Sequence, residues 1–130
     1  MKAIHRSRVP VDRLPGRDVQ RIVGRGASLA SEKMTVGTAS YSDAVGRMEP
    51  HHHAEESIFV LAADRTRVRW GPAPDDLPEV MELQPGLVLH FPEWEWHVFE
   101  WEPGGGADVV VIYGQVDNIR PEDVGLDTRS

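Results

Sequence analysis

The sequence predicts an all-β domain, and three observations lead to that prediction. Short runs of residues alternate apolar and polar side chains, or are rich in β-branched residues, as strands are. Proline and glycine turn signals separate these runs along the chain. No segment carries an apolar stripe of helical period for longer than two turns. Many short strands without helices are typical of a β-sandwich or a β-barrel.

The expected strands follow one another from the N-terminal region to residue 113. They cover residues 19–23, 34–41, 57–61, 66–70, 86–91, 97–101 and 108–113. We interpret Pro103-Gly104-Gly105-Gly106 as a flexible hairpin, because it lacks the strand-to-helix context of a phosphate loop. We expect at most one helical turn, over residues 121–125 after Pro121.

Composition limits the classes of function. The 130 residues fit one domain, and the lack of cysteine means that any metal must be held by nitrogen and oxygen ligands. The chain has no apolar run long enough to span a bilayer and no secretory signal at its N-terminus, so we expect a cytoplasmic protein without a membrane partner. The net charge of −7 argues against nucleic acid as a partner.

A cluster of histidines and glutamates is the strongest candidate site. His51 and His53 share a face if the segment is extended, and Glu55 or Glu56 follows close behind. His97 opens another predicted strand about forty residues later. Imidazole nitrogens with one carboxylate suit Fe, Mn, Ni or Zn. Three adjacent histidines can also form a solvated polar loop, so the run alone leaves both interpretations open.

These segments resemble the two motifs of the cupin superfamily. Gly46, His51-x-His53 and Glu56 follow one another as in the first motif, with each spacer around the histidine pair one residue shorter. Gly86, Pro92 and His97 match the spacing of the second motif. Ala63, Trp94 and Trp101 stand where the motifs have glycine, glycine and asparagine.

The resemblance implies a small single-domain cupin with a double-stranded β-helix, or jelly roll, of two antiparallel sheets. It implies that His51, His53, Glu56 and His97 bind one divalent metal ion, while His52 and Glu55 remain the alternatives for two of these positions. We expect residues 34–115 to form the barrel and residues 1–33 to supply strands that cover an edge or join a dimer partner. Residues 116–130 are expected to be a polar tail, and exposed sheet edges favour a homodimer.

Other residues near the motifs are weaker candidates for binding a substrate. Arg47 could bind a carboxylate, His90 could contact substrate from a strand, Trp94 could stack on a ring, and Tyr113 could donate a proton. Each also has a structural interpretation, as a surface or barrel-wall residue. Arg65, Arg67 and Arg69 alternate with Thr66, Val68 and Trp70, which predicts a solvent-facing row of arginines.

Two classes of function are compatible with these motifs. The first is a metal-dependent enzyme that acts on a small polar metabolite by oxygenase, isomerase or lyase chemistry. The second is a metal-binding or small-ligand-binding module that stores or senses without turnover. The intact ligand set favours the enzyme, and the fold does not choose between them.

Overall fold

A computed structural model describes residues 1–116 of the chain. Eight strands and two short 3-10 helices occur in it, and the expected tail over residues 116–130 lies almost wholly outside the described residues, as does the expected turn at 121–125. The elements are η1 (Arg6–Arg8), β1 (Asp12–Leu14), β2 (Arg17–Gly24), β3 (Leu29–Ala30), β4 (Thr35–Ser42), η2 (Asp43–Val45), β5 (Glu56–Gly71), β6 (Glu79–Glu82), β7 (Val88–Phe91) and β8 (Trp96–Tyr113). No helix among these residues is long and apolar enough to cross a bilayer.

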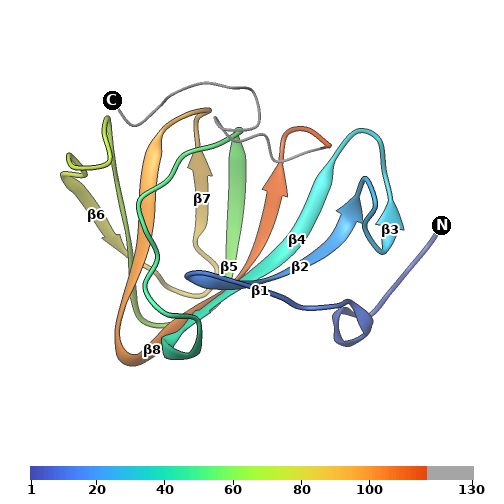
Figure 1. Ribbon diagram of the computed structural model, residues 1–130, viewed down its shortest axis with the longest axis horizontal. Coiled ribbons are helices and arrows are strands. Elements are labelled where there is room, and N and C mark those ends of the chain that lie inside the picture. The colour runs from blue at the N-terminus through green and yellow to red at the C-terminus, as the bar shows by residue number, and fades with distance from the viewer. Residues whose placement is uncertain (117–130) are drawn as a thin grey trace.

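The strands form one rolled sheet in the order β1-β2-β4-β8-β5-β6, with β3 paired to β2 and β7 paired to β5. All pairs are antiparallel except β2 with β3. Figure 1 shows β4 and β2 continuing the sheet beyond the second half of β8, with β6 near the opposite edge. Hydrogen bonding is therefore continuous where two separate sheets were expected, and the all-β prediction is confirmed.

Two long strands produce the roll. β5 and β8 each join two of the predicted strands, and they pair with each other from Glu56↔Tyr113 to Gly71↔Trp96. The register shifts between Val60 and Ala62 and between Asp64 and Thr66, where the ribbon bends. β8 turns sharply at its base in Figure 1. Bulges of this kind let one strand serve both layers of a β-domain.

The glycine segment near residue 105 is part of β8, so its interpretation as a flexible hairpin was wrong. Gly106 pairs with Ser42 of β4 on one side and with Asp64 of β5 on the other. A Cβ atom at Gly106 would lie 2.2 Å from the carbonyl oxygen of Tyr41. Glycine is required here because three backbones approach closely, and not because the chain reverses.

The core lies inside the roll and alternates with surface positions along each strand. On β5, Ile58, Val60 and Val68 are almost fully buried, while Phe59 and Leu61 face outward. Val88 and Ile112 are also exposed, and Val88 is the cross-strand partner of Phe59. These apolar side chains on the outer face are compatible with the homodimer, which stays a prediction.

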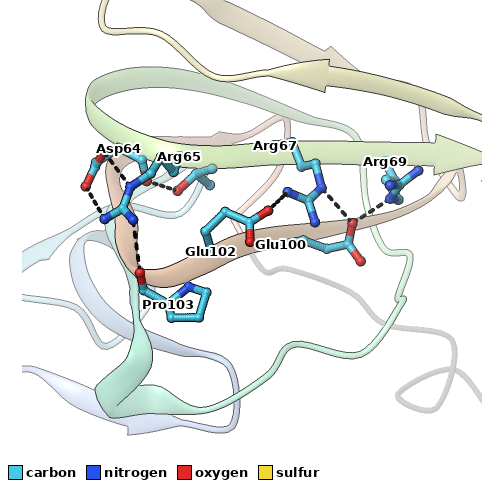
Figure 2. A network of polar contacts seen from close by, with 8 residues as sticks. Asp64, Arg65, Arg67, Arg69, Glu100, Glu102 and Pro103 are labelled. Atoms are coloured by element: carbon cyan, nitrogen blue, oxygen red, sulfur yellow. Dashed lines mark hydrogen bonds and ion pairs between the residues drawn. The ribbon is translucent and has the colours of Figure 1, made fainter.

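The arginines of β5 lie on one face, as the alternation predicts, with Thr66 and Val68 buried on the other. Arg67 and Arg69 are paired with glutamates of β8, whereas Arg65 pairs with its neighbour Asp64 and donates to the carbonyl oxygen of Pro103 (Figure 2). Arg67 contacts Glu100 at 3.3 Å and Glu102 at 2.9 Å. Arg69 also contacts Glu100. Arg67 and Arg69 thus form a cross-strand ion-pair network with Glu100 and Glu102, which stabilises the register of the ribbon modestly.

The N-terminal segment is fastened to the sheet by a second ion pair. Arg6 donates to both carboxylate oxygens of Asp108 on β8, at 2.7 and 3.1 Å, and Ser40 donates to the same carboxylate at 2.8 Å. Partial burial raises the pKa of Asp108, but the hydrogen bonds from Arg6 and Ser40 outweigh it and lower the pKa below its usual value.

We expect Asp108→Asn to lower the free energy of unfolding by about 1–2 kcal/mol at neutral pH. The difference in unfolding free energy between wild type and variant should shrink as the pH falls below about 4. The reason is that a carboxylate with a lowered pKa stabilises the folded state fully at pH values above its pKa in the unfolded chain, and loses this effect as it becomes protonated in the folded state. Urea denaturation at several pH values measures this, with exposed Asp75→Asn as the charge-matched control. Equal losses in the two variants would contradict it.

Candidate metal centre

The candidate centre forms where the segment after η2 crosses the start of β8. His51 and His97 are backbone partners in an isolated antiparallel bridge, with N–O distances of 3.0 and 2.9 Å. The extended backbone turns His51 and His53 to one side and His52 to the other, as period-two alternation predicts. The candidate ligand atoms of His51, His53 and His97 all lie within 4.8 Å of one another.

Backbone carbonyls set the tautomer of all three imidazoles. Nδ1 of His51 lies 3.0 Å from the carbonyl oxygen of Glu49, and Nδ1 of His97 lies 2.9 Å from that of Glu95. The same atom of His53 lies 2.9 Å from the carbonyl oxygen of Ala54. Because a carbonyl only accepts, each Nδ1 carries a proton, and in the neutral ring Nε2 then keeps its lone pair. This is the arrangement of metal-binding histidines.

His97 is the most deeply buried of the three. It is 1% exposed, and its Nε2 makes no hydrogen bond to any described residue. Burial lowers the pKa of His97 well below its usual value, and the neighbouring His51 and His53 lower it further. The imidazole is therefore neutral at physiological pH, with a buried lone pair that a cation would satisfy.

Glu56, the first residue of β5, places a carboxylate beside this cluster. It is 4% exposed, and its Oε1 lies 3.6 Å from Nε2 of His53 and 3.8 Å from Nε2 of His97. Glu55, its neighbour, is exposed and points outward, where it contacts His90 at 2.8 Å. Adjacent residues of an extended chain point to opposite sides, so Glu56 lies inside the roll and Glu55 on its outer surface.

Tyr113 lies opposite Glu56 in the register of β5 and β8 and contacts the ring of His53. Burial raises the pKa of Tyr113 well above its usual value, as do the negative charge of Glu56 and a hydrogen bond between the two side chains. The phenol therefore stays protonated and donates a hydrogen bond to the carboxylate of Glu56. This bond fixes the orientation of Glu56.

The cluster forms part of the wall of a cavity of about 440 Å³. Its other walls come from β2, β4 and β8 and include Val19, Ala39, Phe99 and Val111, together with Tyr41. A volume of this size accommodates a small metabolite. His51, His53 and His97 line this cavity.

The fold is similar to that of several solved structures. The polyketide cyclase RemF from Streptomyces resistomycificus matches with a TM-score of 0.73 at 22% identity, over 92% of this chain and 84% of RemF. Fe(II)-HppE matches with a TM-score of 0.63 at 16% identity, and the DMSP lyase DddQ from Ruegeria pomeroyi DSS-3 with 0.61 at 16%. The alignments cover 87% and 86% of this chain, but only 60% and 54% of those two proteins.

The chain has the cupin fold. The predicted fold is thereby confirmed, from structures that share little sequence with this chain. No protein-family model matches the sequence, and a search of curated proteins gave no significant match. The likeness of fold is thus shown by the solved structures, and it agrees with the resemblance of the two sequence motifs.

Within this cupin fold, the alternative ligand His52 lies apart from the cluster. Its ring stacks on Trp96 with centroids 3.9 Å apart, and its Nδ1 lies 2.9 Å from the carbonyl oxygen of Trp94. Trp94 itself adopts a positive φ of 68° in the turn before β8, and its backbone N–H donates to the carbonyl of His53. His52 and Trp94 thus hold the histidine segment against the turn.

The four residues considered for substrate binding are placed differently. Tyr113 lines the cavity. Arg47 lines a second cavity of about 320 Å³ with Arg67 and Trp101. His90 is exposed on β7, where its ring contacts Ser57 and Glu55 on the outer face. Trp94 and His90 are not among the residues that line the histidine cavity.

Sequence reasoning missed the contribution of β2. Arg17 and Arg21 line the histidine cavity together with Val19. Their alternation with Asp18 and Gln20 marks one face of a strand, which was visible in the sequence. The sequence did not show that β2 pairs with β4, and it is this pairing that turns that face toward the histidines.

Proposed function

We propose that the protein is a metal-dependent enzyme in which His51, His53, His97 and Glu56 hold one divalent ion and a small polar metabolite reacts in the adjoining cavity. One observation carries the proposal: His51, His53 and His97 each place a possible ligand nitrogen within 4.8 Å of the others, beside the buried carboxylate of Glu56. Such a group is costly to bury without a cation, because its polar atoms lose their solvation.

The donor atoms fit a metal of intermediate hardness. Three imidazole nitrogens and one carboxylate oxygen suit Fe, Mn, Ni or Zn. When bound, such an ion supplies Lewis-acid chemistry toward a substrate oxygen or a water molecule, and with iron also redox chemistry. This range includes oxygenase, isomerase and lyase reactions.

The chain's own residues contribute orientation and shielding. Tyr113 holds the carboxylate of Glu56, and the three backbone carbonyls hold the imidazoles, so the ligands keep their positions when a substrate enters. Apolar side chains such as Val111 and Phe99 limit water in the cavity. Polar interactions are stronger in such a site than in bulk water.

The comparisons support a small-molecule substrate without identifying it. A polyketide cyclase, Fe(II)-HppE with a substrate, and DMSP lyases are among the structures that share this fold. Their chemistry belongs to those proteins. For this chain we propose only that the metal centre and the cavity serve a reaction of a small molecule.

The proposal is tested by elemental analysis of tag-free protein purified without chelators or nickel resin. We expect about one equivalent of Fe, Mn, Ni or Zn, and its loss in His51→Ala, a variant chosen because His51 is less buried than His97. His90→Ala is the matched control, since it removes an exposed histidine from the outer face and should keep the metal. Circular dichroism confirms that each variant is folded.

A wild type that holds no metal and takes up none of these four ions would contradict the metal centre. If metal is bound, water-proton relaxation of the Mn²⁺-loaded protein separates the two classes of function. We expect rapidly exchanging water on the ion, as an enzyme requires for substrate access. A coordinatively closed ion would favour the non-catalytic binding module.

A further inference from the structure

The histidine cavity has the opposite charge to the rest of the molecule. The chain carries a net charge of −7, yet the charged side chains among the described residues that line this cavity are three arginines of the β2 region, Arg17, Arg21 and Arg25, and one glutamate, Glu56. Arg25 is paired with Glu32 at 3.1 Å, so Arg17 and Arg21 against Glu56 leave the cavity wall with an excess of one positive charge. A positive cavity in an acidic protein concentrates small anions.

Arg17 is placed in this cavity by strand register. Asp18 of β2 lies opposite Ser40 of β4, so Arg17 lies at the level of Tyr41. Asp18 contacts Arg13 outside the roll, and its neighbour Arg17 takes the inner face, where it lines the cavity with Tyr41.

The turn before Arg17 is packed against the segment that carries the histidines. Gly16 has a φ of +85°, and its N–H donates to the carbonyl of Val45 at 3.0 Å. A Cβ atom at this position would lie 2.8 Å from the Cα of Met48, so only glycine fits. Met48 lies three residues before His51, and the start of β2 is thereby held close to the candidate metal centre.

Electrostatics agree with this placement. Burial raises the pKa of Tyr41 and of Tyr113 most strongly, the charge of Glu56 raises both further, and the guanidinium of Arg17 acts in the opposite direction on both. Arg17 and Glu56 therefore both act on the same two phenols. The charge of Arg17 is permanent at any physiological pH.

We propose that Arg17 is the anion-binding residue of this cavity, and that the substrate is a small organic carboxylate whose reacting part lies toward the histidines. A guanidinium matches a carboxylate in two-point geometry. In this structure Nη1 of Arg17 lies 3.5 Å from the carbonyl oxygen of Pro15, a contact that a bound carboxylate would have to replace or share. Val19 and Val111 provide an apolar wall for the carbon skeleton. The second part of this inference, that the reacting part of the substrate lies toward the histidines, rests on the proposed function. Carboxylate binding by Arg17 does not depend on it.

The test uses pairs of probes that differ in charge and share their shape: acetate with acetamide, and benzoate with benzamide. Protein-observed NMR titrations give the dissociation constants, first on the protein as purified and then after chelation of metal. We expect at least one carboxylate to bind more tightly than its amide in both states. Arg17→Gln should abolish this preference, with an affinity loss of about tenfold or more.

Matched variants separate recognition from a change of fold. Arg17→Lys keeps the charge and should retain part of the preference. Arg13→Gln removes one positive charge from the neighbouring strand on the outer surface and should leave binding unchanged. If no carboxylate binds more tightly than its amide, or if Arg17→Gln keeps the full preference, the assignment is wrong. Because the chelated protein is also titrated, this result does not depend on whether a metal binds.

Discussion

Removal of the metal should lower the thermal midpoint of unfolding by about 10 °C or more. An ion that binds only the folded chain at a thousand times its dissociation constant adds about 4 kcal/mol to the free energy of unfolding. For a domain of this size that corresponds to a shift of this order. This stabilisation is expected because the chain buries His53, His97 and Glu56 together, at 3%, 1% and 4% exposure, and a bound ion would satisfy their polar atoms.

Scanning calorimetry before and after chelation, and after the metal is returned, measures this effect. In His53→Ala, where one ligand is missing, the midpoint should start lower and respond little to the chelator. His90→Ala should behave like the wild type. An unchanged wild-type midpoint after complete loss of metal would show that the cluster is stable without an ion.

The second large effect is expected at Gly106. We expect Gly106→Val to lower the free energy of unfolding by more than about 3 kcal/mol, because its side chain would enter the space of the Tyr41 carbonyl oxygen, 2.2 Å from a Cβ atom. The backbones of β4 and β5 flank this position, so neither can move without breaking pairs on both sides. Urea denaturation provides the measurement.

Gly114→Ala is the matched control for this substitution. A Cβ atom at Gly114 would make an ordinary contact, 3.6 Å from a carboxylate oxygen of Glu55, and we expect a change within about 1 kcal/mol. If Gly106→Val were as stable as Gly114→Ala, the close approach of the three strands would not be a constraint in solution.

The histidines of the candidate centre could be predicted because their arrangement is local. Residues two apart in an extended segment share a side, so the pattern predicts that His51 and His53 lie together. His52 stayed an alternative ligand in the sequence, and the structure places it apart from the cluster. The spacing of the second motif then indicated His97. That the three imidazoles form a cluster is shown by the structure.

The choice between Glu55 and Glu56 illustrates what local pattern leaves open. Both faces of the strand that follows are apolar near its start, since Ile58 and Val60 alternate with Phe59 and Leu61. Alternation therefore could not show which face is interior. The structure shows it through burial, with Ile58 at 1% exposure and Phe59 at 44%.

Arg17 and Gly106 could not be interpreted from the sequence for a different reason. The role of each depends on pairing with strands distant in the chain, β4 for Arg17 and both β4 and β5 for Gly106. A run of glycines after proline is typical of a turn. Only the approach of three backbones shows that the same residues serve a bent, continuous strand.

The ribbon of β5 and β8 also determines how the centre must form during folding. Glu56 pairs with Tyr113 at one end of the ribbon, and His97 pairs with Trp70 near the other, yet the side chains of Glu56 and His97 lie 3.8 Å apart. The ligands can meet only after the ribbon has paired and curled, which requires ordering contacts between residues far apart in sequence. Chain entropy opposes such closure, and proteins dominated by non-local pairing fold in milliseconds to seconds. We therefore expect the cluster of candidate ligands to form late in folding, after β5 and β8 have paired along their length.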